Sequence, residues 1–353
     1  MTDLLDGLSD AERNAVKEAA QPEWTAPMLA TLHDEPFSDP GWIFERKLDG
    51  VRLLAFRQDG RVRLMSRNRN DRSATWFEIR DALEDQDAQD CVVDGEVVAI
   101  SGNVSSFRRL QGRMQVQSEE DARERAETVK VHFYAFDLLH VGGFDVTGLP
   151  LRRRKSLLRK VLSFHDPLHF TPHRNETGEA FLAEACERGW EGLIAKRADS
   201  AYVHTRSNDW LKLKCSHRQE LVVGGFTKPK GSRKGFGAIL VGYHEAGGLR
   251  YAGKVGTGWD DESLVELRAC MDRLEQKTPP LEGGDDLPEK DVHWVTPKLV
   301  AEIGFTEWTD DGKLRHPRFL GLRTDKDPED VVRERPGGRD ASSGSRGNAG
   351  GER

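Results

Sequence analysis

The chain has 353 residues, which is longer than one typical domain, so we expect two domains with separate hydrophobic cores. Charged residues make up 32% of the sequence, and no apolar run approaches the roughly 18 residues that span a bilayer, so we expect a cytosolic protein without a membrane anchor. The net charge of -7 does not favour a nucleic-acid partner, but the basic residues cluster locally and keep that class open.

The four cysteines, Cys91, Cys186, Cys215 and Cys270, are far apart in the sequence. They form no Cys-x-x-Cys pair and have no histidine at the spacing of a metal ligand. This pattern argues against a zinc module and against a secreted disulfide framework. We therefore expect four reduced thiols.

The start of the chain is acidic and interrupted by polar residues, so we expect no signal peptide. Leu4, Leu5 and Leu8 are spaced loosely as in an amphipathic helix, so residues 1–20 are expected to form an N-terminal helical extension. The sequence leaves open whether this extension packs on the rest of the protein.

The stretch Trp42–Phe56 reads WIFERKLDGVRLLAF and predicts two short strands joined through Asp49-Gly50. In that hairpin Lys47 lies near the tip and shares one side of its strand with Glu45. A lysine in a cleft whose pKa is lowered becomes a nucleophile at neutral pH. The alternative, taken from these residues alone, is a solvated hairpin lysine.

The following segments predict further strands and helices in alternation. Strands are expected at 61–66, 91–100 and 129–139, and helices at 75–87, 106–113, 119–128, 151–162 and 177–188. The strand at 91–100 contains Asp94-Gly95-Glu96, and a carboxylate inside an apolar strand needs a cation, metal or hydroxyl as a partner. The alternative is that Glu96 follows a bulge at the edge of the sheet.

Residues 192–198 and 210–215 predict two more strands. In the second, Lys212 and Lys214 are two residues apart and therefore lie on one face. Two lysines that project together from an apolar strand indicate a contact with phosphate.

The composition changes after Cys215 to short strands, glycine turns and one helix at about 260–276, which is typical of a small Greek-key barrel of the OB type. The expected fold class is α+β. The expected division is an extension at 1–20, a main domain with antiparallel sheets and flanking helices at 21–215, an OB-fold domain at 216–327, and a disordered Gly/Ser/Arg-rich tail at 328–353.

Seven short motifs occur in an order that resembles the covalent nucleotidyltransferases, the superfamily of ATP-dependent DNA ligases, RNA ligases and mRNA capping enzymes. They are Lys47-Leu-Asp49-Gly50-Val-Arg52, Ser66-Arg67-Asn68, Asp94-Gly95-Glu96, Phe136-Asp137, Glu191-Gly192-Leu-Ile-Ala-Lys196, Trp210-Leu-Lys212-Leu-Lys214 and Arg323-Thr-Asp325-Lys326. Within the superfamily the amino-acid sequence is most similar to the ligase module of bacterial non-homologous end-joining DNA ligases. Thr205 departs from that family, where glycine is expected, and leaves the geometry of its loop in question.

The resemblance implies an ATP-dependent DNA ligase that joins a 5'-phosphate to a 3'-hydroxyl through lysyl-AMP and DNA-adenylate. It assigns catalytic roles to Lys47, Asp49, Lys212, Lys214, Arg323, Asp325 and Lys326. It assigns nucleotide contacts to Glu45, Lys47, Arg52, Arg67, Glu96, Phe136, Lys196, Lys212 and Lys214, with Phe136 stacked on adenine. Positive charge from Lys212, Lys214 and a divalent metal is expected to lower the pKa of Lys47.

Magnesium, or manganese, is the implied metal, with Glu96 and Glu191 as its ligands or as anchors for them. Contacts with the DNA backbone are expected from Lys228, Lys230, Arg233 and Lys234 and from the basic helix that starts at residue 152, with a merely solvated surface as the alternative. The implied partners are nicked or broken double-stranded DNA and a Ku-type end-binding protein. We expect a monomer in the bacterial cytosol.

Two rival functions remain. An RNA ligase or GTP-using capping enzyme shares the chemistry, although the similarity to end-joining ligases argues against capping. A catalytically silent nucleic-acid-binding module would have lost at least one charged motif residue, and none is lost.

Overall fold

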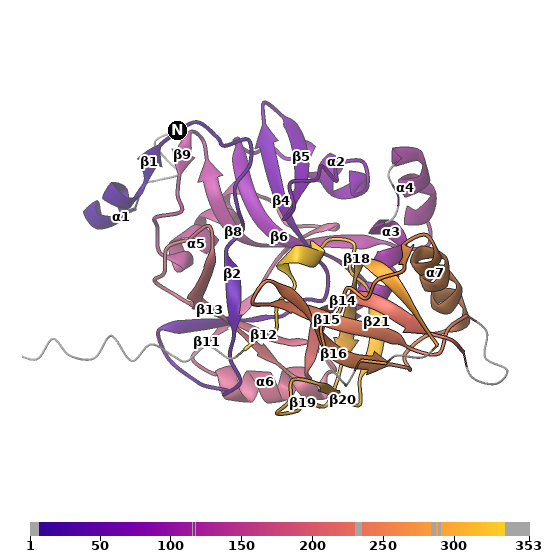
Figure 1. Cartoon of the computed structure of the whole chain (residues 1–353). Helices are drawn as coiled ribbons and strands as arrows, with labels where there is room; N and C mark the ends of the chain where they lie inside the picture. Colours follow the sequence, from indigo (N-terminus) through magenta and orange to yellow (C-terminus); the bar gives the residue numbers. More distant parts are fainter. Residues whose placement is uncertain are drawn as a thin grey trace, which may run out of the picture.

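The computed structural model describes residues 7–114, 116, 118–229, 235–283, 287–288 and 291–335. Three main β-sheets account for the architecture, with most helices on their outer sides and the helix Phe107–Met114 between the first sheet and the third (Figure 1). Two sheets belong to the first 214 residues, and the third is built from residues 218–322. The α+β class is therefore confirmed.

The first sheet is antiparallel apart from one short parallel strand. Its order is β1 (Lys17–Glu18), β9 (Phe144–Asp145), β8 (Val131–Val141), β6 (Cys91–Ser101), β4 (Val51–Gln58) and β5 (Arg61–Ser66), with β10 (Leu168–Phe170) parallel to β8 and β7 (Val104–Ser105) beside β6. The second sheet has the order β11 (His173–Asn175), β3 (Trp42–Arg46), β12 (Gly192–Arg197), β13 (Arg206–Lys214) and β2 (Leu29–Leu32).

The segments Trp42–Arg46 and Val51–Gln58 are strands, but the predicted hairpin between them is wrong. β3 pairs with β11 and β12, whereas β4 pairs with β5 and β6, so residues 47–50 cross from one sheet to the other. A Cβ added at Gly50 would lie 2.2 Å from the Val97 carbonyl oxygen, so glycine is required by close approach rather than by a hairpin turn. Lys47 consequently lies where the two sheets meet.

The third sheet contains β16 (Gly248–Val255), β15 (Ile239–Glu245), β14 (Arg218–Thr227), β18 (Val292–Gly304) and β17 (Glu275–Gln276), with β21 (Arg318–Leu322) beside β18. All its pairings are antiparallel, and β19 (Glu307–Trp308) and β20 (Leu314–Arg315) form a separate ribbon. Apolar side chains such as Val222, Phe226 and Val241 make its core. It forms a unit with a core of its own, as the sequence predicts for the second domain.

The helices largely match the predicted ones. They are α1 (Asp10–Ala15), α2 (Phe77–Glu84), α3 (Phe107–Met114), α4 (Glu119–Ala126), α5 (Leu151–Val161), α6 (Gly178–Glu187) and α7 (Asp261–Asp272), with a 3-10 turn η2 (Pro328–Asp330). The predicted helix over residues 1–20 is limited in the described residues to Asp10–Ala15, because a Ser9 capping box starts it there and the chain is extended from Val16.

The basic helix α5 does not present its whole charge run to solvent, so the predicted DNA-contacting patch is wrong for Arg154 and Lys155, while a DNA contact from the exposed Arg152 and Arg153 stays a prediction. Arg154 and Lys155 are buried at 0% and 2% exposure, since the apolar face of the helix packs on β8. Arg154 pairs with the buried Asp137 at 2.7 Å, and Lys155 pairs with Glu45 at 2.5 Å. These two cations therefore serve the interior of the protein.

Cys186 and Cys215 are joined in a disulfide, with their Cα atoms 5.2 Å apart, so the expectation of four reduced thiols is wrong. The pairing is invisible in the sequence because α6 and the end of β13 meet only in the folded chain. Thr205 has no positive φ, so its side chain fits the loop where glycine was expected.

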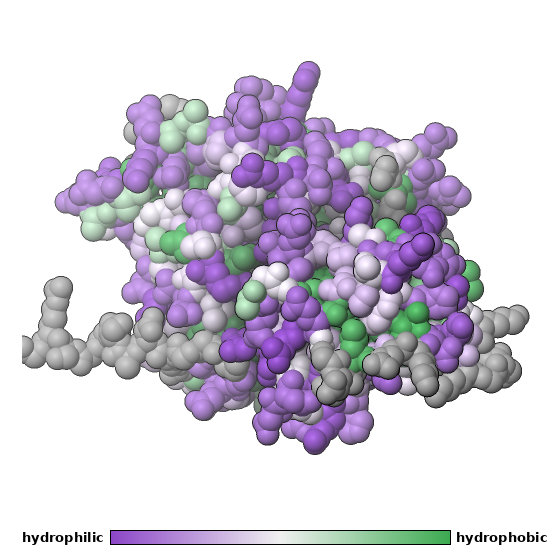
Figure 2. Space-filling model, in the orientation of Figure 1, coloured by the Kyte–Doolittle hydropathy of each residue, from purple (hydrophilic) through white to green (hydrophobic). Residues whose placement is uncertain are grey.

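No helix in the described ranges is long and apolar enough to cross a membrane. The face drawn in Figure 2 is largely hydrophilic, with its hydrophobic residues in small patches, most of them over the third sheet.

Candidate active site

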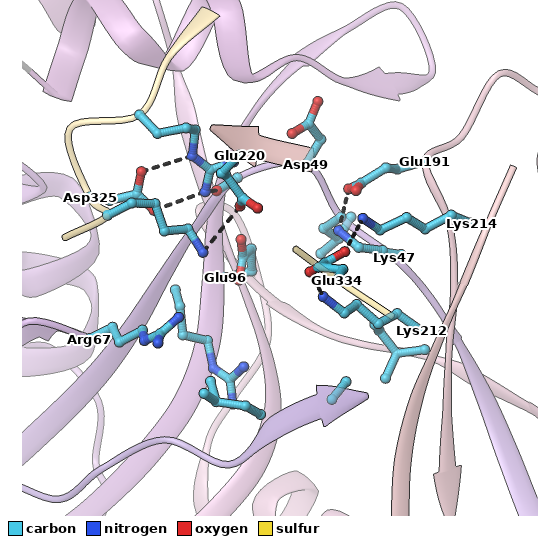
Figure 3. Close-up of a pocket in the computed structure, with 18 of the residues that line it drawn as sticks. Lys47, Asp49, Arg67, Glu96, Glu191, Lys212, Lys214, Glu220, Asp325 and Glu334 are labelled. Atoms are coloured by element: carbon cyan, nitrogen blue, oxygen red, sulfur yellow. Dashed lines mark hydrogen bonds and ion pairs between the residues drawn. The ribbon is translucent and has the colours of Figure 1, made fainter. Parts of the chain in front are cut away.

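A cavity of about 260 Å³ lies between the first two sheets and the third (Figure 3). Residues from all three sheets and from the segment after β21 line it. The cavity brings together Glu45, Lys47, Asp49, Arg52, Arg67, Glu96, Phe136, Glu191, Lys196, Lys212, Lys214, Arg323, Asp325 and Lys326, which are the predicted catalytic, nucleotide and metal residues. These residues come from positions 45 to 326, so only the fold places them side by side.

Lys47 is held by its backbone and its side chain. Its N–H donates to the Gly192 carbonyl at 2.9 Å, and its Nζ lies 2.5 Å from a carboxylate oxygen of Glu191. Burial alone would lower the pKa of Lys47, but Glu191, with Asp49 and Glu96, raises it above its ordinary value. In this arrangement the ammonium form is favoured, which differs from the lowered pKa expected from the sequence.

A further carboxylate, that of Glu334, reaches the two lysines on β13. It forms ion pairs with Lys212 and, at 2.8 Å, with Lys214, so the positive charge of both lysines is compensated in this arrangement. Although burial works in the opposite direction, the two lysines lower the pKa of Glu334 to about 2. Burial lowers the pKa of Lys212 to about 8. The two lysines do share one face, as predicted.

Glu334 is positioned by the segment around it. Gln219 on β14 donates from its amide to the Val332 carbonyl at 2.9 Å and accepts from the Glu334 N–H at 3.0 Å. The Val331 carbonyl accepts from the His244 N–H at 2.7 Å. The predicted disorder from residue 328 is therefore wrong for residues 328–335, because backbone pairing and the two lysines fix them, while residues 336–353 lie outside the described range.

Carboxylates gather around Lys47 as well. Glu96 is half-buried in the wall of the cavity, where desolvation raises its pKa to about 7 despite the nearby Arg52 and Lys47. Among the described residues Glu96 forms no ion pair within 4 Å, whereas the carboxylate of Glu191 is paired with Lys47. Carboxylate oxygens are the hard ligands that Mg²⁺ and Mn²⁺ prefer, so Glu96 and Glu191 fit the predicted metal by ligand type, and Glu96 also lacks a compensating cation in direct contact.

Aromatic and charged side chains form the far wall of the cavity. The Arg52 guanidinium lies 4.6 Å from the Phe136 ring centre, and Lys196 Nζ lies 4.2 Å from it. Arg52 is also paired with Asp94, which gives this carboxylate the partner that its strand position requires. Lys196 is paired at 2.7 Å with Glu45. The buried carboxylate of Glu45 therefore holds both Lys196 and Lys155 in place.

The Arg323 motif closes over the cavity from the third sheet. Arg323 pairs with Asp325 at 2.8 Å and donates to the Gly50 carbonyl at 3.4 Å. Lys326 lies 3.3 Å from Glu220. Arg67 pairs with Asp330 at 3.4 Å, so it contacts the closing segment in this arrangement. The described arrangement is thus a closed one.

The predicted DNA-contacting loop is only partly described. Lys228 is exposed and lies 3.4 Å from Asp291, whereas Lys230, Arg233 and Lys234 lie outside the described residues. A DNA contact at Lys228 stays a prediction.

The sequence analysis missed several charged residues of the cavity, among them Arg218, Glu220, Glu302 and Glu334. Arg218 pairs with Asp49 at 3.3 Å, and Glu302 pairs with Arg323 at 3.3 Å. Glu302 carried a usable signal, since it is a carboxylate inside the apolar strand LVAEIGF, the same pattern that identified Glu96. Glu334 carried none, because its surroundings are polar.

Comparison with known proteins gives matches over nearly the whole described chain. The family model "ATP dependent DNA ligase domain" matches residues 27–214, and "ATP dependent DNA ligase C terminal region" matches residues 232–326. The multifunctional non-homologous end joining protein LigD of Pseudomonas aeruginosa is 38% identical over 331 residues, which cover 92% of this chain and 38% of that protein. The multifunctional non-homologous end joining DNA repair protein LigD of Mycobacterium tuberculosis is 37% identical over 318 residues, covering 88% of this chain and 40% of that protein.

The chain thus spans about two fifths of the length of these relatives. A solved structure of mycobacterial DNA ligase D complexed with ATP and MES is 36% identical, has a TM-score of 0.62, and is matched over 88% of this chain and 98% of that one. The agreement confirms the predicted nucleotidyltransferase fold followed by an OB-type unit. The chain belongs to the family of ATP-dependent DNA ligases.

Proposed function

We propose that this chain seals nicks and broken ends in double-stranded DNA through an AMP group carried on Lys47. The observation that supports this most is the meeting of Lys47, the paired lysines Lys212 and Lys214, and the carboxylates Glu96 and Glu191 in one cavity. The relatives are named for non-homologous end joining, so repair of double-strand breaks is the proposed setting, with a Ku-type end-binding partner.

In the first step Lys47 Nζ attacks the α-phosphorus of ATP. A phosphorus–nitrogen bond forms, the bond to the oxygen that bridges the α- and β-phosphates breaks, and pyrophosphate leaves. Lys212 and Lys214 stabilise the charge that develops on the phosphate, while Phe136 packs against adenine. The ammonium proton must leave first, and Glu191, 2.5 Å from Nζ, is placed to accept it.

Phosphate charge is compensated by a divalent cation when one is bound, and Glu96 and Glu191 are the residues proposed to hold Mg²⁺ or Mn²⁺. Arg323, Asp325 and Lys326 orient the departing pyrophosphate in the closed arrangement. After the unit opens, AMP passes to the 5'-phosphate of DNA, and the 3'-hydroxyl then displaces it.

The direct test is sealing of a nicked duplex by the purified protein in Mg²⁺. We expect sealing with ATP and with a 5'-phosphate at the nick, and none with a 5'-hydroxyl, because only the phosphate can accept AMP. Parallel reactions with GTP and NAD test the nucleotide, and blunt or overhanging ends test end joining.

Three results would contradict the proposal. Folded protein that seals no nick with any nucleotide would remove the ligase activity, and sealing supported only by NAD would remove ATP as the donor. A nick within an RNA duplex, sealed faster than the DNA nick, would assign the chain to RNA.

The contact of Glu334 with Lys212 and Lys214 predicts competition with the phosphates of ATP. A carboxylate and a phosphate cannot occupy the same two lysines, so Glu334→Ala is expected to lower the KM for ATP in lysyl-AMP formation. The expected change is about tenfold, equivalent to ~1.4 kcal/mol. The rate of label transfer from α-labelled ATP to protein, at a series of ATP concentrations, measures it.

Glu329→Ala is the matched control, since Glu329 is an exposed carboxylate of the same segment that contacts neither lysine. Equal KM values for Glu334→Ala and the unaltered protein would contradict this prediction. They would show that ATP displaces Glu334 from the two lysines without a loss of binding free energy.

A further inference from the structure

A cluster of metal-binding side chains lies outside the cavity that contains Lys47. His132 lies on β8, His169 lies on β10, and Asp166 precedes β10 in the connecting loop. The parallel pairing of β10 with β8 sets His169 opposite Tyr134, two residues after His132. The proposed ligase chemistry uses none of these residues.

The three side chains converge on one point. His132 Nδ1 lies 2.8 Å from Asp166 Oδ1 and 3.2 Å from His169 Nε2, and His169 Nε2 lies 3.4 Å from the same Asp166 oxygen. Bonds of about 2.0–2.2 Å around a tetrahedral metal put neighbouring ligand atoms roughly 3.3–3.5 Å apart. The triangle therefore needs to expand by only a few tenths of an ångström to hold a cation.

The chemistry of the set is specific. Two imidazole nitrogens and one carboxylate oxygen match the three-protein-ligand pattern of zinc sites that keep one position open. The Tyr134 ring stacks on His169 at 4.8 Å and holds its orientation.

We propose that His132, Asp166 and His169 form a binding site for a divalent cation of the zinc class, with one coordination position left to water or to an external ligand. An ordinary hydrogen bond would need only one histidine beside Asp166. The imidazole of His169 is directed both at the same Asp166 oxygen and at the imidazole of His132. A cation shared by all three side chains explains this arrangement.

Co²⁺ titration of the purified full chain tests the site, with excess Mg²⁺ present to occupy the carboxylates near Lys47. Visible d–d absorption of tetrahedral Co²⁺ is expected, together with its displacement by Zn²⁺. In the double variant His132→Gln/His169→Gln the absorption is expected to be lost. His165→Gln is the matched control, because His165 is an exposed histidine of the same loop that is absent from the triangle.

Melting temperatures in EDTA establish that the variants fold. Zn²⁺ is then expected to raise the melting temperature of the unaltered protein and of His165→Gln, and not that of the double variant. Identical Co²⁺ spectra and identical Zn²⁺ stoichiometries in the unaltered protein and the double variant would overturn the proposal, as would absence of any Co²⁺ absorption. ATP-dependent sealing in Mg²⁺ is expected to be the same in all three proteins.

Discussion

Lys47→Ala is expected to abolish the covalent transfer of AMP from ATP to the protein. Nζ is the atom that bonds to phosphorus in the proposed first step, and no other described lysine of the cavity has the same place between the carboxylates. Loss of a nucleophile costs a factor on the order of 10⁴ or more. Incubation with α-labelled ATP and Mg²⁺ without DNA, followed by denaturing electrophoresis, measures the retained label.

Lys47→Arg makes this test sharper, since arginine keeps the positive charge beside Glu191 but stays protonated. It should also retain no label. Lys160→Ala, a change of an exposed lysine on α5, should retain the label of the unaltered protein. Label that survives in Lys47→Ala would place the nucleophile elsewhere in the chain.

The same Lys47 variant separates the steps of the reaction. A nick that already carries DNA-adenylate needs only the final displacement, so Lys47→Ala is expected to seal it without ATP, although more slowly than the unaltered protein. Failure on this substrate as well would mean that the substitution damages more than the nucleophile.

Arg154→Ala is expected to destabilise the protein by about 3–5 kcal/mol, because it leaves the carboxylate of Asp137 buried and uncompensated. Both residues are 0% exposed, and the Arg154 guanidinium also donates to the Ser200 carbonyl at 2.8 Å. Urea unfolding followed by tryptophan fluorescence gives the change in the free energy of unfolding.

The double variant Arg154→Leu/Asp137→Leu is the matched control. Removing both charges replaces the ion pair with apolar contacts, so it should be less destabilised than Arg154→Ala alone. If the double variant loses at least as much stability, then packing of the long arginine side chain, rather than charge, is the dominant contribution.

The sequence predicted most elements but not how they pair. Alternating apolar residues identify a strand locally, and Trp42–Arg46 and Val51–Gln58 were found in that way. Their partners lie elsewhere: β3 pairs with β12, about 150 residues away, which no local pattern contains. Asp-Gly between two apolar runs is a strong local signal for a hairpin turn, so the hairpin was the simpler interpretation of the sequence, although it is wrong here.

Residues that line the cavity could be predicted where a charged residue interrupts an apolar strand, as at Glu96 and Lys212, while their roles stay predictions. The sequence did not predict residues that reach the cavity only because the third sheet and the segment after it close over the first two sheets. Glu334 is the example. The basic helix shows the same limit, since Lys155 looks like part of a solvated charge run until Glu45 is placed 2.5 Å away.

Ion pairs such as Asp49 with Arg218, Arg67 with Asp330 and Lys214 with Glu334 join the first two sheets to the third sheet and the segment after it. A DNA duplex is far larger than a cavity of about 260 Å³, so the proposed sealing of DNA would require these pairs to separate in every round. Dissolved salt screens them and thereby eases opening, but it also weakens the hold on DNA phosphates. The rate of sealing should therefore pass through a maximum at an intermediate ionic strength instead of falling steadily as salt is added.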